Sequence, residues 1–258
     1  MYEKWPDTEE EKEFRRKNME FLTDRIRKEF DFSRSDQSRM VPEPPFQKPY
    51  GSGDPIIELP RREDWSDVCD IPLASAIGSR RSRRSFKDEK LSLEELSFLL
   101  WATQGIRDPR RHYLRTVPSA GARHSFETYL SIGKVNGIES GLYRYLPLEH
   151  SLIQLTVDDG ITSKTAAGSF KQMFIAGSAV VFIWTTIPYR MEWRYGPAAH
   201  RVIAFDIGHV CQNLYLACEG IGAGTCGIGA YDQERIDELL GVDGEDEFTI
   251  YLAPVGKV

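Results

Sequence analysis

Several common sequence signals are missing from this 258-residue chain, and each absence narrows what it can do. The cysteines show neither CxxC nor Cys/His spacing, so we expect no zinc or other metal site and no disulfide bonds. No apolar run reaches membrane-spanning length, and the N-terminus lacks the apolar core of a signal peptide. We therefore expect a cytoplasmic protein with no membrane partner.

An excess of basic residues is also absent, since 33 Lys and Arg face 39 Asp and Glu and give a net charge of −6. A general nucleic-acid-binding protein would carry a basic face or domain, so we expect no nucleic-acid partner. The exception is the segment Arg80–Phe86, with four Arg and two Ser in seven residues. The guanidinium fork matches phosphate oxygens. Composition alone leaves three readings open: a phosphate-bearing cofactor, a solvated basic loop, or a nucleic-acid patch.

The first 55 residues predict a helix and an arm that precede a domain over residues 56–258. Residues 8–30 read as one amphipathic helix, opened by a Thr8–Glu11 capping box, with apolar residues recurring on one face. The proline-rich segment 41–50 suits neither a helix nor a central strand. We expect it to run over a surface, either its own or that of a partner subunit.

The sequence of the domain predicts helices and strands in an irregular order. Helices are expected at 72–78, 92–105, 198–220 and 232–241, and strands at 126–135, 142–146, 152–157, 179–187 and 248–254. The order is not βαβα, so the pattern indicates an α+β fold and not a Rossmann fold. The glycine-rich segment 220–229 follows a helix, which excludes the strand–turn–helix context of a dinucleotide fingerprint.

Three segments have the composition of a cofactor site. These are the arginine-rich segment 80–86, the small-residue segment 118–124 and the glycine-rich segment 220–229. Small residues let backbone N–H groups approach a flat ligand closely, and Arg supplies charge for a phosphate. A large planar cofactor with one phosphate would use all three segments.

These motifs, in this order, resemble the nitroreductase-fold flavoproteins and, within them, the SagB-type dehydrogenases. The resemblance covers residues 70–258 and rests on Arg80-x-Ser82-x-Arg84-x-Phe86, Pro118–His124, Arg194–Pro197, Asp206–Leu214, Gly227–Tyr231 and Pro254–Gly256. It implies a nitroreductase-like α+β fold, with a central, mostly antiparallel sheet flanked by helices. It also implies FMN bound at the interface of a homodimer.

The resemblance assigns roles to individual residues. Arg80, with Arg81, and Ser82 match positions that hold phosphate and ribityl oxygens, and Arg84 matches the cation near the pyrimidine edge of the flavin. The segment that lines the ring, in the family from either subunit, consists of Pro118, Ser119, Ala120, Gly121 and Ala122. The backbone facing flavin N5 consists of Gly227, Ile228, Gly229 and Ala230. Many nitroreductases add basic residues after the last strand, where this sequence offers only Lys257.

Arg194 and Tyr195 are the candidate catalytic residues. Peptide-modifying SagB-type enzymes carry a Lys-Tyr pair at these positions, and that Lys is thought to act as a base in azoline oxidation. Arg stays protonated at any working pH and is a poor base, so azoline oxidation is in doubt. Tyr195 could still donate a proton to a substrate.

The implied function is that of an FMN-dependent oxidoreductase. Hydride from NAD(P)H would pass through flavin N5 to a small organic acceptor in a ping-pong cycle. Two alternatives stay open: a SagB-type peptide azoline dehydrogenase, and a non-catalytic flavin-binding or redox-sensing protein.

Other polar residues have competing interpretations. His124 is equally a structural histidine or a substrate contact, and Arg123 either grips an anionic substrate or is solvated. We expect packing and interface hydrogen bonds for His209 and Asn213, and a buried, unreactive thiol for Cys226.

Overall fold

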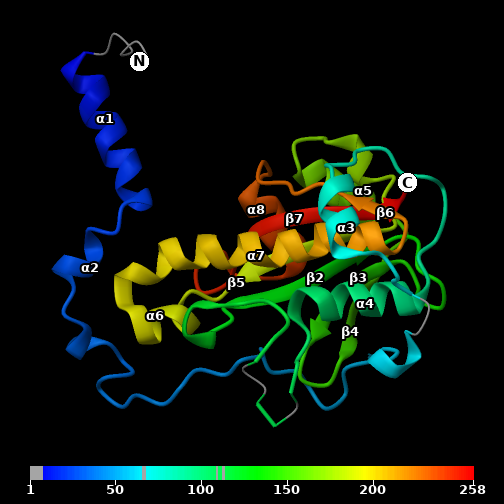
Figure 1. Ribbon diagram of the computed structural model, residues 1–258, viewed down its shortest axis with the longest axis horizontal. Coiled ribbons are helices and arrows are strands. Elements are labelled where there is room, and N and C mark those ends of the chain that lie inside the picture. Colours follow the sequence, from blue (N-terminus) through cyan, green and yellow to red (C-terminus); the bar gives the residue numbers. More distant parts are fainter. Residues whose placement is uncertain (1–7, 66–67, 109, 112–113) are drawn as a thin grey trace.

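A seven-stranded antiparallel sheet forms the centre of the molecule (Figure 1). The computed structural model describes residues 8–65, 68–108, 110–111 and 114–258. The spatial order of the strands is β1-β4-β3-β2-β5-β7-β6. Their bounds are β1 Ile56–Glu58, β2 Phe126–Ile132, β3 Gly141–Leu146, β4 Ser151–Val157, β5 Val180–Thr186, β6 Ala223–Thr225 and β7 Phe248–Lys257. The expected α+β architecture with an antiparallel sheet is confirmed.

Helices cover both faces of the sheet. α4 (Leu93–Gln104) and α7 (Ala199–Gly220) pack on one face, and α5 (Ile161–Gly168) and α8 (Gln233–Leu240) pack on the other. The remaining helices are α1 Glu9–Met19, α2 Ile26–Glu29, α3 Leu73–Ser79 and α6 Tyr189–Tyr195. α3 lies against α7 near the C-terminal end of the chain (Figure 1).

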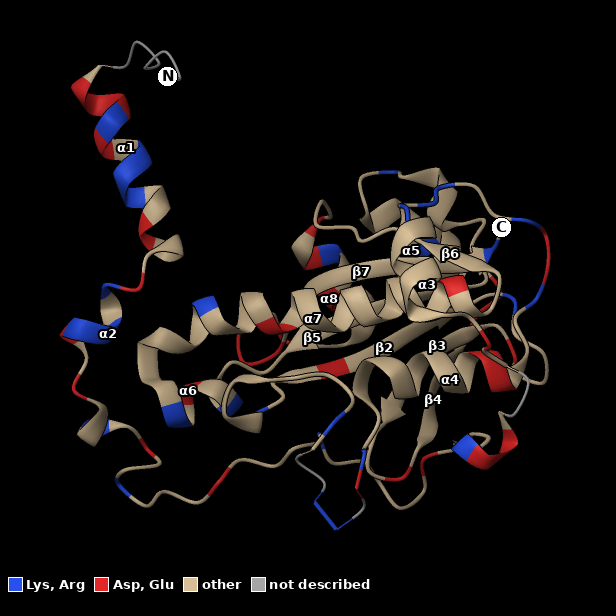
Figure 2. Cartoon of the chain, in the orientation of Figure 1, with Lys and Arg blue, Asp and Glu red and all other residues tan. Residues whose placement is uncertain are grey.

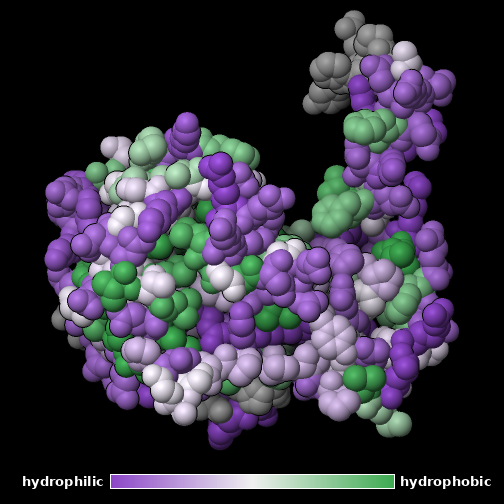
Figure 3. All heavy atoms as spheres, turned by 180° about the vertical axis from the view of Figure 1, so that it is seen from behind, coloured by the Kyte–Doolittle hydropathy of each residue, from purple (hydrophilic) through white to green (hydrophobic). Residues whose placement is uncertain are grey.

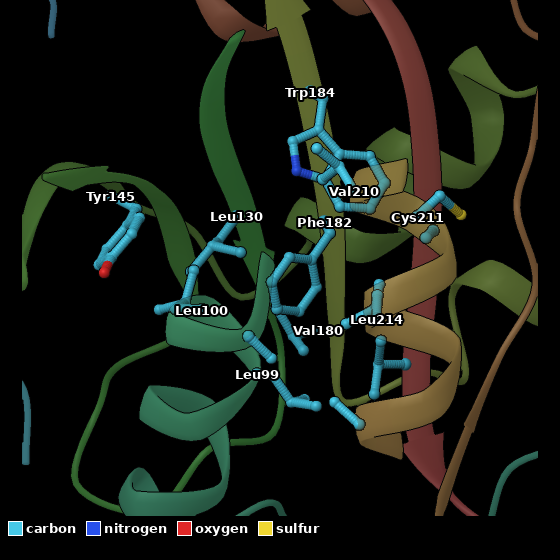
Figure 4. Close-up of a cluster of buried hydrophobic side chains, with 14 of the residues drawn as sticks. Leu99, Leu100, Leu130, Tyr145, Val180, Phe182, Trp184, Val210, Cys211 and Leu214 are labelled. Atoms are coloured by element: carbon cyan, nitrogen blue, oxygen red, sulfur yellow. The ribbon is translucent and has the colours of Figure 1, made fainter. Parts of the chain in front are cut away.

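The two-sided sheet explains the continuous apolar sequence of β5. Successive side chains of a strand point to opposite faces. Phe182 and Trp184 therefore join the core under α4 and α7, while Val181 and Ile183 join the core under α5 and α8. Figure 4 shows Phe182 and Trp184 beside residues of α4 and α7. A strand buried on both faces needs no alternation of polar residues.

Helix ends follow the caps read from the sequence. The Ser92 hydroxyl accepts from the backbone N–H of Glu95 at 3.1 Å, which opens α4. The Asp232 carboxylate caps α8, and Gly241, with φ of 70°, ends that helix in the left-handed conformation. The glycine-rich segment differs from expectation, because residues 223–225 form β6 on the sheet edge beside β7.

The predicted single helix over residues 8–30 is wrong. The Thr8–Glu11 capping box is present, but α1 ends at Met19, and Thr23 is extended, with ψ of 156°. The Thr23 hydroxyl donates to the carbonyl of Glu20 and helps to end the helical segment there. α1 buries no residue, so packing does not hold the second half in register with it. α1 projects from the body of the molecule (Figures 1 and 3).

The proline-rich arm lies on its own subunit. The backbone N–H of Lys48 donates to the Glu127 carboxylate at 2.7 Å, and the Arg144 guanidinium donates to the carbonyl of Pro49 at 2.9 Å. Trp193 donates its indole N–H to the carbonyl of Val41 at 2.9 Å. These contacts hold the arm against the surface of its own subunit.

No helix within the part of the chain that the structure describes is long and apolar enough to cross a membrane. Across the same residues, no cluster of His, Cys, Asp and Glu could hold a metal ion.

Candidate functional site

The arginine-rich segment is fixed by pairing with the sheet edge. Ser82 forms a parallel bridge with Thr225 of β6, and the N–H of Arg83 donates to the carbonyl of Thr225 at 2.9 Å. The side chain of Arg83 lies over Gly224, where an added Cβ would come within 2.4 Å of Arg83 Cγ. Because an extended segment alternates its side chains, Ser82 points away from Arg83, toward α7. Figure 2 shows Lys and Arg gathered in the loop after α3.

Tyr215 of α7 joins the arginine-rich segment to the glycine-rich segment. Its hydroxyl lies 3.0 Å from Ser82 Oγ and accepts from the N–H of Gly227 at 2.8 Å. The Arg80 guanidinium lies 5.4 Å from the centre of the Tyr215 ring. We call Arg80, Arg81, Ser82, Arg84, Tyr215 and Gly227 the basic cluster. Sequence reasoning missed Tyr215, because one Tyr on a mostly apolar helix reads as packing.

The basic cluster holds cations without acidic partners. No carboxylate within the described ranges forms an ion pair with Arg80, Arg81 or Arg84, and Arg81 and Arg84 are exposed. Three such groups in a protein of net charge −6 form a local positive patch whose donors are free of described carboxylates. Their donors, with the Ser82 hydroxyl, have the chemistry needed to hold a phosphate.

The segment Gly227–Ala230 runs beside β7. Ile228 donates its N–H to the carbonyl of Leu252 at 2.7 Å. A Cβ on Gly227 would lie 2.4 Å from the Tyr251 hydroxyl, so only glycine fits there. Gly229 and Ala230 are exposed. The segment is therefore held at Gly227 and Ile228 and exposed at Gly229 and Ala230.

Lys257 is already engaged by the protein. Its ammonium group forms an ion pair with Glu95 and donates to the carbonyl of Ile221 at 2.7 Å. A phosphate-binding role for Lys257 would have to compete with Glu95.

The small-residue segment meets Arg194 and Tyr195. Gly121 has φ of 59°, and an added Cβ would lie 2.8 Å from Tyr195 Oη and 3.0 Å from Arg194 Nε. The N–H of Ala120 donates to the Asp206 carboxylate at 3.2 Å. Burial raises the pKa of Asp206. We call Gly121, Ala120, Arg194, Tyr195 and Asp206 the Tyr195 cluster.

Arg194 and Tyr195 lie at the end of α6, beside the N-terminal segment. Gly196, with φ of 49°, ends α6, and its α-carbon faces the Phe30 ring, which a Cβ would approach to 2.5 Å. The Arg194 and Arg27 guanidinium groups lie 5.6 and 5.9 Å from the centre of the Tyr195 ring. No described carboxylate pairs with Arg194.

Both sequence interpretations of Arg123 are wrong. Its side chain is buried, pairs with Glu43, and donates through Nε to the carbonyl of Arg190 at 3.0 Å. The guanidinium lies 4.9 and 4.8 Å from the ring centres of Phe46 and Trp193. Arg123 thus clamps the proline-rich arm to α6, a role that no local sequence pattern reveals.

The remaining polar residues have mostly structural surroundings. Asn213 donates to the carbonyl of Ala102 at 2.8 Å, as a packing role requires, and Cys226 is buried as expected. His124 is buried, and its N–H donates to Ser119 Oγ at 3.0 Å. His209 lies on an exposed stripe of α7.

The basic cluster and the Tyr195 cluster lie at different turns of α7. Asp206 and Tyr215 are nine positions apart, which corresponds to about 14 Å along the helix axis. Gly208 and His209, between them, are exposed, and so is Phe205 just before Asp206. The phosphate and ring ligands read from the sequence are therefore gathered into two separate groups.

A cavity on the same side of the sheet as α4 and α7 is lined by none of the predicted site residues. It has a volume of about 1370 Å³ and lies between α3, α4 and α7, with Trp65, Phe98 and Trp101 in its wall. His150 in its wall already has a hydrogen-bond partner within the protein, since His150 Nε2 lies 2.8 Å from Ser97 Oγ.

Comparison with known proteins gives a consistent result. The model of the family described as "Nitroreductase family" matches residues 77–257. A nitroreductase-family protein of Methanocaldococcus jannaschii is 36% identical over 191 residues, which are 74% of this chain and 93% of that protein. The trifolitoxin-processing protein TfxB of Rhizobium leguminosarum bv. trifolii is 30% identical over 197 residues. The match spans 67% of this chain but about half of TfxB, at 51%.

Solved structures agree on the fold. A nitroreductase-family crystal structure from Ralstonia eutropha has a TM-score of 0.67 and 25% identity, covering 81% of this chain and 92% of that one. The microcin synthetase McbBCD complex of E. coli contains a chain with a TM-score of 0.61 and 21% identity, covering 78% of each chain. The family match over most of the chain, the relative of similar length and these folds confirm the resemblance read from the motifs: this protein belongs to the nitroreductase family.

Proposed function

We propose that this protein is an FMN-dependent oxidoreductase that takes reducing equivalents from NAD(P)H and passes them to a small organic acceptor. The observation that carries the proposal is the basic cluster. Arg80, Ser82 and Arg84 stand where the family motif requires them, and none of the arginines is neutralised by a described carboxylate. Family membership supports the redox chemistry, which the flavin supplies when bound.

The residues of this chain would divide the work of binding. Arg80, Arg81 and Ser82 would hold the phosphate and ribityl oxygens, and Arg84 would place positive charge near the pyrimidine edge. Gly227 to Ala230 would present backbone to one edge of the ring, and Pro118 to Ala122 would line its face. Lys257 would add to the phosphate site only by leaving Glu95.

Tyr195 is the proposed proton donor to the acceptor, and Arg194 the adjacent cation. Arg194 cannot serve as a base at neutral pH, because a guanidinium stays protonated. Its charge would instead stabilise negative charge that develops on the acceptor. The contact of both side chains with Gly121 places them next to the proposed ring-lining segment.

We further propose that the working form is a homodimer with α7 at its centre. If α7 packs antiparallel to its copy about a two-fold axis, the basic cluster of one subunit faces the Tyr195 cluster of the other. The exposed stripe of α7 with Phe205 and Gly208, which has no atom within 4 Å of an added Cβ, supports such an approach. Each cofactor would then be held by both subunits.

The test is the visible absorption spectrum of the purified protein, with the released chromophore identified by mass. We expect one FMN per chain and oxidation of NADH or NADPH by the loaded protein. A protein that carries no flavin and takes up none from solution would overturn the proposal. A loaded protein that oxidises neither nicotinamide would instead favour a flavin-binding or redox-sensing role.

A second candidate is a SagB-type azoline dehydrogenase. The likeness to TfxB, a toxin-processing protein, and to a chain of the microcin synthetase complex favours it. Arg194 in place of the family's Lys argues against it. Oxidation of a thiazoline peptide by the flavin-loaded protein, and its increase in Arg194→Lys, would support this candidate; no oxidation by either form would exclude it.

A further inference from the structure

A small pocket lies where the N-terminal segment meets the end of α6. Its volume is about 310 Å³, and Arg27, Phe32, Ser35, Gln37 and Ser38 face Arg194 and Tyr195 across it. The size is at the low end for small-molecule sites. This segment precedes the part of the chain that the family model matches, which begins at residue 77. The pocket is therefore built partly by residues outside the family domain.

Positive charge exceeds negative charge at this pocket. Arg27 pairs with Asp24 at 2.8 Å, and Arg201 pairs with the same carboxylate at 3.2 Å. Asp24 therefore serves two cations, while Arg194 has no carboxylate partner in the described ranges. The other acidic groups nearby are occupied, since Asp36 accepts from Tyr189 and Glu192 contacts His200. The pocket holds an excess of guanidinium groups that a ligand can use.

The two guanidinium groups converge on the Tyr195 ring. Arg27 lies 5.9 Å and Arg194 lies 5.6 Å from the ring centre. A planar fork of donors suits the two oxygens of a carboxylate. The same Arg194 and Tyr195 contact Gly121, so the pocket adjoins the proposed ring-lining segment. A ligand held here would keep its charged end at the arginines and its body toward the ring.

The N-terminal segment is fastened well enough to form a binding wall. The N–H of Gln37 donates to the carbonyl of Trp193 at 2.8 Å, and Tyr189 donates to Asp36 at 2.8 Å. The Ser38 hydroxyl donates to the carbonyl of Phe32 at 2.9 Å. The first two bonds tie the N-terminal wall of the pocket to α6, whose last residues are Arg194 and Tyr195, and the third braces that wall internally.

We propose that this pocket binds the carboxylate of an anionic electron acceptor through Arg27 and Arg194. The proposal rests on the function proposed above, because the acceptor is defined by that reaction. It assigns the N-terminal segment a part in choosing the acceptor: small aromatic or aliphatic acids are preferred over their neutral counterparts.

The test compares 4-nitrobenzoate with 4-nitrobenzamide, which differ only in the charged group. Both are titrated by protein fluorescence without reductant, and both are used as acceptors with NADH and with NADPH. Loss of a hydrogen-bonded ion pair is expected to remove about a 10-fold preference for the acid in Arg194→Gln and Arg27→Gln. Arg194→Lys keeps the charge and should retain part of the preference.

The matched control is Arg34→Gln. Arg34 is exposed on the same segment and does not line the pocket. It should leave the acid preference unchanged. Far-ultraviolet circular dichroism of each variant confirms that the fold is kept.

The outcomes separate this inference from the proposed function. Equal affinity of the wild type for acid and amide, or a preference that survives in Arg194→Gln, overturns the inference even if nicotinamide oxidation is normal. An acid preference that Arg194→Gln removes, in a protein that oxidises no nicotinamide, supports the carboxylate site and overturns the function. A KM that rises for NADPH but not for NADH in Arg194→Gln assigns the anion to the donor's phosphate and overturns the inference.

Discussion

Arginines gather near both ends of α7, but they differ in whether a carboxylate pairs with them. At the C-terminal half, Arg80, Arg81 and Arg84 have no described carboxylate partners. At the N-terminal end, most arginines are occupied: Arg190 pairs with Glu127 at 2.5 Å and Arg123 with Glu43. The difference shows that an arginine without a carboxylate partner loses no donor to an acidic group, whereas a paired arginine such as Arg27, whose Nε donates to Asp24, keeps only its remaining donors for a ligand.

The occupied arginines hold the molecule together. Glu127 of β2 is buried and accepts from Arg190 and from the backbone N–H of Lys48, and Arg144 lies 3.8 Å away. Glu127 thus joins α6, the arm and β3. A charge buried without its partner is costly, so this network is expected to matter more for stability than any exposed ion pair.

The largest effect should come from breaking that network. Glu127→Gln leaves Arg190 and Arg144 buried without a countercharge, and we expect a loss of about 3–5 kcal/mol in the free energy of unfolding. Urea unfolding measures it. The control Glu139→Gln, at an exposed glutamate, should change stability by less than about 0.5 kcal/mol. Equal effects of the two variants would remove the distinction between occupied and available charges.

The second effect concerns the available arginines. Arg80→Ala should weaken FMN binding by about 10- to 100-fold, since a hydrogen bond to a charged group contributes about 1.5–3 kcal/mol. Stability should stay close to that of the wild type, because Arg80 has no described carboxylate partner. Fluorescence titration of the flavin-free protein with FMN measures the affinity, with Arg34→Ala as control. Unchanged affinity in Arg80→Ala would contradict the phosphate assignment.

A smaller effect is expected at Asp206, which accepts from the backbone N–H of Ala120 in the proposed ring-lining segment. Burial raises its pKa, so the charged form is disfavoured in the folded protein. Its favourable contribution is present below the unfolded pKa and is lost as the pH rises through the raised native pKa. Asp206→Asn, which keeps an acceptor for Ala120, should therefore gain stability relative to wild type as the pH rises above about 4, the ordinary pKa of an aspartate. A stability difference that does not change with pH would contradict this reading.

The smallest expected effect concerns the reactivity of the cysteine thiols on and near α7. Burial raises the pKa of Cys211 to about 12 and raises the pKa of Cys218 well above its ordinary value. Cys226 is buried, whereas Cys69 is partly exposed. Iodoacetamide at pH 8 should label Cys69 alone in the native protein and all four thiols in urea. Labelling of native Cys226 would show that the glycine-rich segment opens.

Much of the fold was readable from local patterns. The capping boxes of α1 and α4, the continuous apolar run of β5 and the Gly241 helix end each act over a few residues, and each is present. The break at Thr23 was not readable, because a helix of this length keeps its register only if a surface packs against it. Propensity and periodicity carry no information about the missing surface.

Only those parts of the candidate site that depend on local sequence could be predicted. Arg80, Ser82 and Arg84 follow from a local motif, and the extended segment places them together. Tyr215 and the Arg123–Glu43 pair depend on contacts between residues far apart in sequence. Sequence alone cannot say which arginine meets a carboxylate, so it treated Arg123 as available when the fold had paired it.

The central claim is that each cofactor is held by the basic cluster of one subunit and the Tyr195 cluster of the other. The direct test mixes Arg80→Ala with Gly121→Val, two variants that each disable one cluster, and isolates the mixed dimer. The account predicts that, at an FMN concentration between the dissociation constants of the wild type and of Arg80→Ala, neither variant alone retains FMN, while the mixed dimer binds one FMN, because one of its two sites combines two intact clusters. A mixed dimer that binds none would place both clusters of each site in the same subunit and contradict the account.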